Sequence, residues 1–213
     1  MAARTLIKSM IPAAVLLAGG VFGASTARAD DPPADAKRGG HIAYTCFGCH
    51  GIPDYRNAYP NYHVPRLGGQ HAGYLSAALA EYRAGTRSHP TMRGQAASLT
   101  DADLRDVAAY FAAATPSPAG GGSGVGALPA AAQLCIACHG KDGVGITADY
   151  PTLSGQYADY LETALKAYRK GTRQNPIMGG FAATLKDEDI AALAKYFAAQ
   201  QPALGVPLPP RAP

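Results

Sequence analysis

The sequence lacks the features that would place it among membrane-spanning or nucleic-acid-binding proteins. No apolar run after residue 29 approaches the roughly 20 residues that a bilayer span requires. Charged residues make up only 16% of the chain and form no basic run, so nothing indicates binding to nucleic acid. No segment shows a sustained alternation of apolar and polar residues, so little or no β-sheet is expected.

The first 29 residues have the order of a secretory signal. Arg4 and Lys8 precede an apolar stretch at residues 11–22, and residues 27–29 form an A-x-A cleavage site. Cleavage there would start the mature chain at Asp30. It would also lower the formal net charge of +4 by three, because three basic residues and no acidic residue would be lost. We therefore expect export to the periplasm. An uncleaved membrane anchor is the alternative. For the cleaved protein we expect a loose membrane association at most.

The chain repeats itself. Residues 65–113 recur at 151–199 with 27 identities in 49 positions and no gap. Residues 115–126, rich in proline, glycine and serine, have the composition of a flexible linker. We therefore predict two domains, residues 35–114 and 127–200, followed by a proline-rich tail at 201–213.

Each repeat contains two segments with the apolar spacing of a helix face. The first-repeat sets are Tyr74, Leu75, Ala78, Leu79 and Tyr82, then Leu104, Val107, Ala108 and Phe111, and the second-repeat sets are Tyr160, Leu161, Ala164, Leu165 and Tyr168, then Ile190, Leu193, Ala194 and Phe197. Thr100 can cap the later helix of the first repeat. Domains of about 75 to 80 residues have small cores, so we expect a bound group to supplement the apolar burial.

Each repeat is preceded by a C-x-x-C-H motif, at residues 46–50 and 135–139. This is the attachment motif for c-type haem. Cysteines three apart on a helical turn lie on one face, where their sulfurs can form thioethers with the two vinyl groups of the ring. The following histidine then points toward the iron, for which imidazole is a common axial ligand. The motifs predict two covalent haems, attached through Cys46, Cys49, Cys135 and Cys138 and ligated by His50 and His139.

Two other uses of the cysteines compete with this interpretation. A pair of C-x-x-C units can bind one zinc ion, and cysteines in an oxidising compartment can form disulfides or a redox pair. Neither use explains why a histidine follows each unit, and the two units belong to separate repeats.

Met92 and Met178 are the candidate second axial ligands. They occupy the same position in the two repeats, and both are predicted to lie in loops between a proline and a glycine. A His/Met pair is typical of electron-transfer cytochromes c. The alternative is that each methionine fills a gap in the core. The other histidines are weaker candidates because none has a histidine counterpart in the second repeat: His41, His63, His71 and His89.

Two further pairs of residues recur in both repeats. Pro65 and Pro151 are candidates to accept the second ring N–H of the ligand histidine through their carbonyls, unless they are simple turn prolines. Arg87 and Arg173, which recur together with a second arginine pair four residues earlier, are candidates to contact haem propionates. A solvated helix face is the alternative for these arginines.

These motifs together resemble the cytochrome c4 family. Two C-x-x-C-H domains of class I type, each with P-x-L-x-G-Q, then Y-R-x-G-x-R and a methionine, cover nearly all of residues 40–200. The resemblance implies an all-α fold of two tandem class I cytochrome c domains, each wrapped around a covalent haem and related by a pseudo-twofold axis. It also implies a donor on the quinol–cytochrome c reductase side and a terminal oxidase as the acceptor. Residues 51–64 and the linker depart from the family pattern.

The axial ligands indicate what the protein does. Histidine and methionine together fill both axial positions, so neither iron has a site for oxygen, peroxide or another substrate. We therefore expect a periplasmic dihaem electron carrier of a respiratory chain, not an enzyme. One alternative is a haem subunit of a larger dehydrogenase, such as flavocytochrome c sulfide dehydrogenase. Another is a dihaem peroxidase, which would need one open or displaceable axial ligand.

Overall fold

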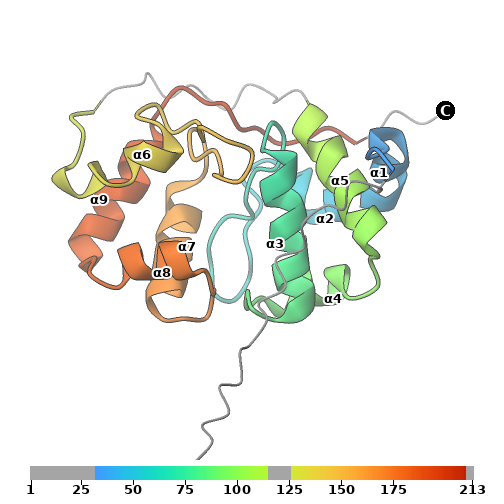
Figure 1. Cartoon of the computed structure of the whole chain (residues 1–213), viewed down its shortest axis with the longest axis horizontal. Helices are drawn as coiled ribbons and strands as arrows, with labels where there is room; N and C mark the ends of the chain where they lie inside the picture. Colours follow the sequence, from blue (N-terminus) through green and yellow to red (C-terminus); the bar gives the residue numbers. More distant parts are fainter. Residues whose placement is uncertain (1–31, 115–125, 210–213) are drawn as a thin grey trace, which may run out of the picture. The chain divides into compact units, whose positions relative to one another are not determined.

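The computed structural model describes residues 32–114 and 126–209, here called the first and second halves. The predicted signal segment and most of the predicted linker lie outside these residues. The described residues form helices joined by loops. They contain isolated β-bridges but no β-strand (Figure 1). The helices of the first half are α1 (Ala36–Ile42), α2 (Phe47–His50), α3 (Ala72–Ala84), α4 (Pro90–Ala96) and α5 (Asp101–Ala113). Those of the second half are α6 (Ile136–His139), α7 (Ala158–Arg169), α8 (Pro176–Ala182) and α9 (Asp187–Ala198).

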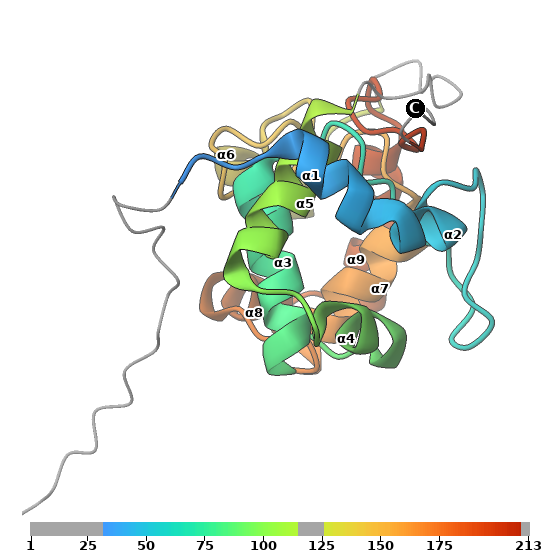
Figure 2. The same ribbon diagram turned by 90° about the vertical axis from the view of Figure 1, so that its right-hand side faces the viewer.

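The later long helix of each half, α5 or α9, carries the core. All four apolar residues predicted on each face are buried. The helix α5 begins at the Thr100 cap, whose hydroxyl accepts the Asp103 backbone N–H. It packs against α3, and α9 packs against α7 in the same way. In the first half α1 also lies on α5 (Figure 2). Gly39 permits this approach, because a Cβ there would come within 2.0 Å of the Asp106 carbonyl oxygen.

The earlier long helices, α3 and α7, use their apolar faces differently. Only Leu75 and Ala78 of α3, and Leu161 of α7, are fully buried. The remaining predicted face residues are partly exposed, and every residue of both predicted faces lines a cavity that the two halves share. The periodicity therefore predicted the helices correctly, but these faces form the wall of a cavity.

The two candidate methionines lie in short helices, so their predicted placement in loops was wrong. Met92 is in α4 and Met178 is in α8. Both helices begin with a proline, which suits the first helical position because its missing N–H would have no partner there. The residue before the proline caps each helix, and its side chain accepts the methionine N–H: His89 in the first half and Asn175 in the second.

Reciprocal contacts join the two halves. Arg87 and Arg173 form an antiparallel β-bridge. Next to it, the Ser88 N–H donates to the Thr172 carbonyl at 2.9 Å, and the Gln174 N–H donates to the Thr86 carbonyl at 2.8 Å. The second bond is the first with both residues replaced by their counterparts in the other repeat, since Gln174 corresponds to Ser88 and Thr86 to Thr172. This exchange is the pattern that a pseudo-twofold axis produces.

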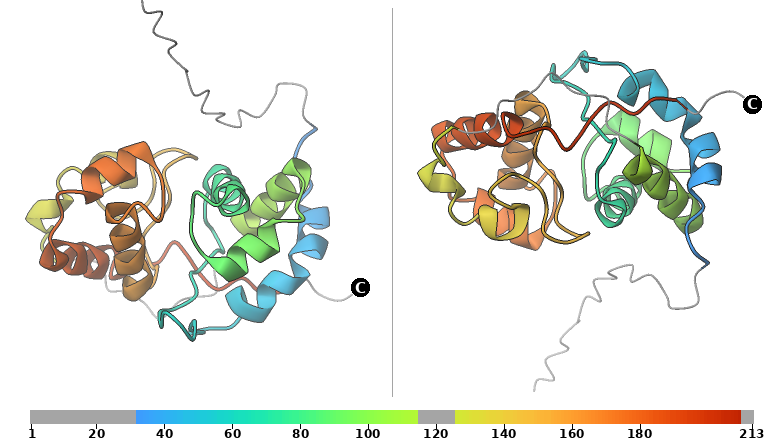
Figure 3. Two further views of the ribbon diagram at one scale, coloured as in Figure 1. Left: turned by 90° about the horizontal axis from the view of Figure 1, so that it is seen from below. Right: turned by 90° about the horizontal axis from the view of Figure 1, so that it is seen from above.

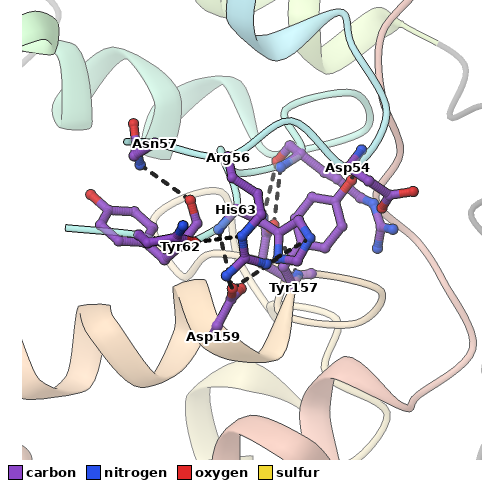
Figure 4. A network of polar contacts seen from close by, with 10 residues as sticks. Asp54, Arg56, Asn57, Tyr62, His63, Tyr157 and Asp159 are labelled. Atoms are coloured by element: carbon purple, nitrogen blue, oxygen red, sulfur yellow. Dashed lines mark hydrogen bonds and ion pairs between the residues drawn. The ribbon is translucent and has the colours of Figure 1, made fainter. Parts of the chain in front are cut away.

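The segment that departs from the family pattern, residues 51–64, reaches the second half and contacts the start of α7 (Figure 4). The His63 backbone N–H and Nδ1 lie 3.2 and 2.8 Å from one carboxylate oxygen of Asp159, and Arg56 lies 3.1 Å from the same oxygen. The His63 ring stacks on Tyr157, with the ring centroids 4.4 Å apart. The Asp54 N–H donates to the Tyr157 hydroxyl. Residues 51–64 therefore connect the first half to the second.

The described part of the proline-rich tail, residues 201–209, is packed against the first half. Gly205 and Gly68 exchange two backbone hydrogen bonds of 3.0 Å, and the Tyr110 hydroxyl donates to the Leu208 carbonyl. Leu204 is fully buried. This segment leaves α9 and runs back to the side of the molecule that holds α1 and α5 (Figure 3). Within residues 32–114 and 126–209, no helix has the length and apolarity needed to cross a bilayer.

Candidate haem sites

The first C-x-x-C-H motif forms a single helical turn at one side of the cavity. Cys46 precedes α2, whose last residues include Cys49 and His50, and all three side chains line the cavity. His50 is 8% exposed, and its Nδ1–H donates to the Pro65 carbonyl at 2.9 Å. Burial lowers the pKa of His50 to about 4, so the ring is neutral at pH 7. Its Nε2 is left as a free acceptor, which is the form that a metal requires.

The second motif repeats this arrangement. Cys135 precedes α6, which contains Cys138 and ends at His139. The His139 Nδ1–H donates to the Pro151 carbonyl, again at 2.9 Å, and burial lowers the pKa of this ring as well. A proline carbonyl thus orients the histidine in each half, although the connecting loops differ by three residues in length.

Met92 and Met178 line the same cavity as the histidines of their respective halves. Each side chain is partly exposed, so neither methionine has the full burial of a core filler. The capping bonds to their backbone N–H groups fix the first turn of α4 and α8 around them. The structure therefore places a thioether and a neutral imidazole from each half on the wall of the shared cavity.

The alternative uses of the cysteines find no support in the described residues. The four cysteines are not joined in disulfides there. The same part of the chain contains no group of three or more histidine, cysteine, aspartate or glutamate side chains arranged to hold a metal ion. Each half instead supplies two thiols, an imidazole and a thioether, the donor set that a covalently attached, axially ligated haem requires.

Two buried arginines lie where the halves meet. Arg87 and Arg173 are each 6% exposed, and both line the cavity. Arg87 Nη1 and Arg173 Nε are buried without a hydrogen-bond partner in the described part of the chain. Arg87 Nη1 lies 3.9 Å from a carboxylate oxygen of Glu81. Buried guanidinium groups with spare donors fit an anionic group in the cavity, such as a propionate.

The second pair of recurring arginines has a different environment. Arg83 donates to the Leu99 carbonyl and to Asp101, at the start of α5. Arg169 makes the equivalent bonds to the Leu185 carbonyl and Asp187, at the start of α9. Each of these arginines therefore connects one long helix to the start of the following long helix, and neither side chain lines the cavity.

Sequence reasoning missed the polar residues that connect the halves at the cavity. Tyr160 accepts a hydrogen bond from Arg87, and Tyr74 accepts the equivalent bond from Arg173. Gln70 and Gln156 are each 4% exposed and bond to the backbone of the opposite half. All four residues recur at identical repeat positions, so their identity in both repeats was the available signal.

The fold and these sites define a class of protein. The family model for cytochrome c matches residues 36–114 and 128–200. The chain therefore belongs to the cytochrome c family.

Within that family, the chain is similar to dihaem cytochromes c4. Cytochrome c4 of Pseudomonas aeruginosa is 36% identical over 197 residues, which cover 85% of this chain and 94% of that protein. The crystal structure of reduced recombinant cytochrome c4 from Pseudomonas stutzeri matches with a TM-score of 0.61 and 34% identity, covering 79% of this chain and all of that one. The thiosulfate dehydrogenase electron acceptor of Stutzerimonas stutzeri is 39% identical over 172 residues, covering 73% of this chain and 79% of that protein.

These relationships establish the cofactors and the general activity. The protein carries two covalently bound haem c groups, one for each cytochrome c domain. It is a dihaem electron-transfer protein and not an enzyme, as its cytochrome c4 relatives are electron carriers.

Proposed function

We propose that this protein is a periplasmic single-electron carrier of a respiratory chain that passes electrons toward a terminal oxidase. The observation that carries the proposal is the equivalence of the two sites. In each half a histidine oriented by a proline carbonyl and a methionine at the start of a short helix line the cavity. A site built for a substrate would need one half to lack a candidate ligand, and both halves offer the same candidate pair.

The roles of the residues follow from their chemistry. The haem iron, when bound, supplies reversible one-electron exchange between its ferrous and ferric states. Cys46, Cys49, Cys135 and Cys138 hold the two rings through thioethers. His50 and His139 provide nitrogen to the iron, and their other ring nitrogen is held by Pro65 and Pro151. Met92 and Met178 provide sulfur, a soft ligand that favours reduced iron and raises the potential.

Arg87 and Arg173 are proposed to balance the propionate charges. The two guanidinium groups are buried, face the cavity and retain unpaired donors. Because a buried cation also disfavours the ferric state, this arrangement suits a high-potential carrier.

The location and the route are supported by the sequence. The signal-like order of the first 29 residues supports export, with loose membrane association at most. The resemblance to cytochrome c4 supports a donor on the quinol–cytochrome c reductase side and an oxidase as acceptor. Amino-terminal sequencing of protein isolated from the periplasm tests export directly and should begin at Asp30. Retention of residues 1–29 in the membrane fraction would contradict soluble export.

A second route is favoured by one of the relatives. A protein named as the electron acceptor of thiosulfate dehydrogenase is 39% identical to this chain. The corresponding proposal is that this carrier takes electrons from a dehydrogenase of reduced sulfur compounds, either freely or as its haem subunit. A dihaem peroxidase is not favoured, because the two sites carry matched ligands.

Stopped-flow reduction of the oxidised holoprotein separates these routes. One arm uses the quinol–cytochrome c reductase with a quinol, and the other uses a thiosulfate-oxidising dehydrogenase with thiosulfate. The respiratory proposal predicts rapid reduction in the first arm. Rapid reduction in the second arm alone would replace it with the sulfur-compound route. Turnover of hydrogen peroxide by the reduced protein would contradict both.

A further inference from the structure

Gln70 and Gln156 are the glutamines of the P-x-L-x-G-Q pattern, and each is bonded to the half to which it does not belong. The Gln156 side chain accepts the Arg66 N–H at 3.0 Å and donates to the Arg66 carbonyl, also at 3.0 Å. The Gln70 side chain accepts the Thr152 N–H and donates to the Thr152 carbonyl, both at 2.9 Å. Each glutamine therefore holds one residue of the opposite half by both of its backbone groups.

The residue held in this way directly follows the proline that orients a histidine. Arg66 follows Pro65, and the Arg66 N–H belongs to the same peptide group as the Pro65 carbonyl. One end of that peptide group accepts the His50 Nδ1–H, and the other end donates to Gln156. In the second half the chain of bonds runs from His139, through the peptide group between Pro151 and Thr152, to Gln70.

The orientation of both amides is fixed by a second donor. The Gln156 Oε1 also accepts the backbone N–H of Tyr157 at 3.1 Å, and the Gln70 Oε1 accepts that of His71 at 3.0 Å. Two N–H donors converge on each of these atoms, so the atom must be the oxygen of the amide. Both side chains are 4% exposed, so water does not compete freely for these bonds.

We propose that Gln156 is a positioning residue for His50, and Gln70 for His139, each acting across the boundary between the halves. A peptide group whose N–H is hydrogen-bonded is polarised, so its carbonyl becomes a better acceptor. A stronger bond to the carbonyl makes the imidazole more basic and fixes its ring plane. A more basic imidazole favours ferric iron. The state of each iron site thus depends on a side chain of the other half.

This inference rests on the proposed roles of His50 and His139 as iron ligands. It goes beyond those roles, because contact between the halves then becomes part of each histidine site. The competing interpretation is that the glutamines only hold the halves together. In that case, removing either one would loosen a shared boundary and would affect both sites.

The test measures both reduction potentials of the holoprotein, with the two haems assigned by NMR contacts to residues of their own halves. Gln156→Leu keeps the approximate size of the side chain and removes its hydrogen bonds. It should raise the potential of the first-half haem and leave that of the second unchanged. Gln70→Leu is the matched variant and should do the reverse.

Gln156→Glu provides a variant with the opposite expected sign. A carboxylate accepts the Arg66 N–H more strongly than an amide does, although it can no longer donate to the Arg66 carbonyl, so the first-half potential should fall relative to the second. If Gln156→Leu does not fold with both haems, the Gln156→Glu variant still tests whether Gln156 sets the potential of the first-half haem. A purely structural role would shift the two potentials together.

Equal shifts of both haems, or folded variants with unchanged potentials, would overturn the proposal. Failure of the proposed ligand roles of His50 and His139 gives a different result, because the unmodified protein would then not titrate as two one-electron centres. The outcome of one test can therefore be told apart from that of the other.

Discussion

Arg87 donates a hydrogen bond of 2.7 Å to the hydroxyl of Tyr160, a residue of the other cytochrome c domain. The reciprocal bond, from Arg173 to Tyr74, is 2.8 Å long. Each guanidinium also lies over a tyrosine ring of its own domain, Tyr82 or Tyr168. Two cations are thus held within aromatic surroundings at the boundary, where the field of each is weakly screened. The most direct consequences concern redox potential.

Replacing Arg87 with glutamine should lower the reduction potential of the first haem. Loss of a buried positive charge removes part of the electrostatic cost of ferric iron, on the order of 1 kcal/mol. Spectroelectrochemical titration measures the shift. Arg93→Gln, at an exposed arginine of the same half, is the control and should leave the potential almost unchanged. An equal shift in both variants would argue against a special role for Arg87.

Leu204→Ala should destabilise the protein although this residue lies outside both repeats. Leu204 is fully buried, and truncating such a leucine costs about 2–5 kcal/mol. Chemical denaturation of the holoprotein measures the change. Leu208, four residues further on, is 71% exposed, so Leu208→Ala should change the free energy of unfolding by less than about 0.5 kcal/mol. Equal effects would mean that residues 201–209 do not pack as described.

The ion pairs at the start of α5 and α9 should make stability depend on pH in the acidic range. The hydrogen bond from Arg83 lowers the pKa of Asp101, and that from Arg169 lowers the pKa of Asp187. A carboxyl whose pKa is depressed on folding contributes stability above its unfolded value, about 3.9, and loses it as the pH falls through the folded value.

The double variant Asp101→Asn/Asp187→Asn should therefore show a smaller fall in melting temperature between pH 5 and pH 3 than the unmodified protein. The difference should be small, because both carboxylates are exposed. Asp149→Asn, at another exposed carboxylate, should keep the original pH dependence. A double variant with that same dependence would show that the pairs contribute nothing.

Met178→Ala should open one axial position. About half of the weak near-infrared absorption of methionine-ligated ferric haem should be lost. The second haem should then bind carbon monoxide when reduced, and its potential should fall, because a soft sulfur that favours reduced iron is gone.

Met92→Ala is the matched variant, but His89 complicates it. His89 already bonds to the Met92 N–H and could replace the lost ligand, whereas the equivalent residue of the second domain is Asn175. Unchanged spectra in Met178→Ala would remove Met178 as a ligand.

The sequence was sufficient to predict the four long helices and the turn of each C-x-x-C-H motif, because these depend on local spacing. The faces of α3, α5, α7 and α9 followed from apolar periodicity, and the C-x-x-C-H motif marked its own turn. The predicted loop placement of Met92 was wrong, because Pro90 is the first residue of the helix α4. The residue that caps α4, His89, is not a typical helix cap, so the sequence did not indicate that a helix begins there.

The contacts across the boundary could not be predicted in the same way. His63 and Asp159 are 96 residues apart in the chain, and neither residue has a counterpart of the same type in the other repeat. Gln70 and Gln156 were visible as a repeated pair. Periodicity, however, describes one element at a time and does not say which half a buried amide will contact. The sequence marks residues 201–213 only as a proline-rich tail, and its composition does not show that Leu204 is fully buried.

A potentiometric titration of the intact holoprotein, followed by haem absorbance with and without carbon monoxide, tests the central claim most directly. Two histidine–methionine sites predict two one-electron steps, both at positive potentials, with carbon monoxide changing neither step. A single step, or a carbon monoxide adduct of either haem in the native reduced protein, would contradict the assignment of this chain as a closed dihaem electron carrier.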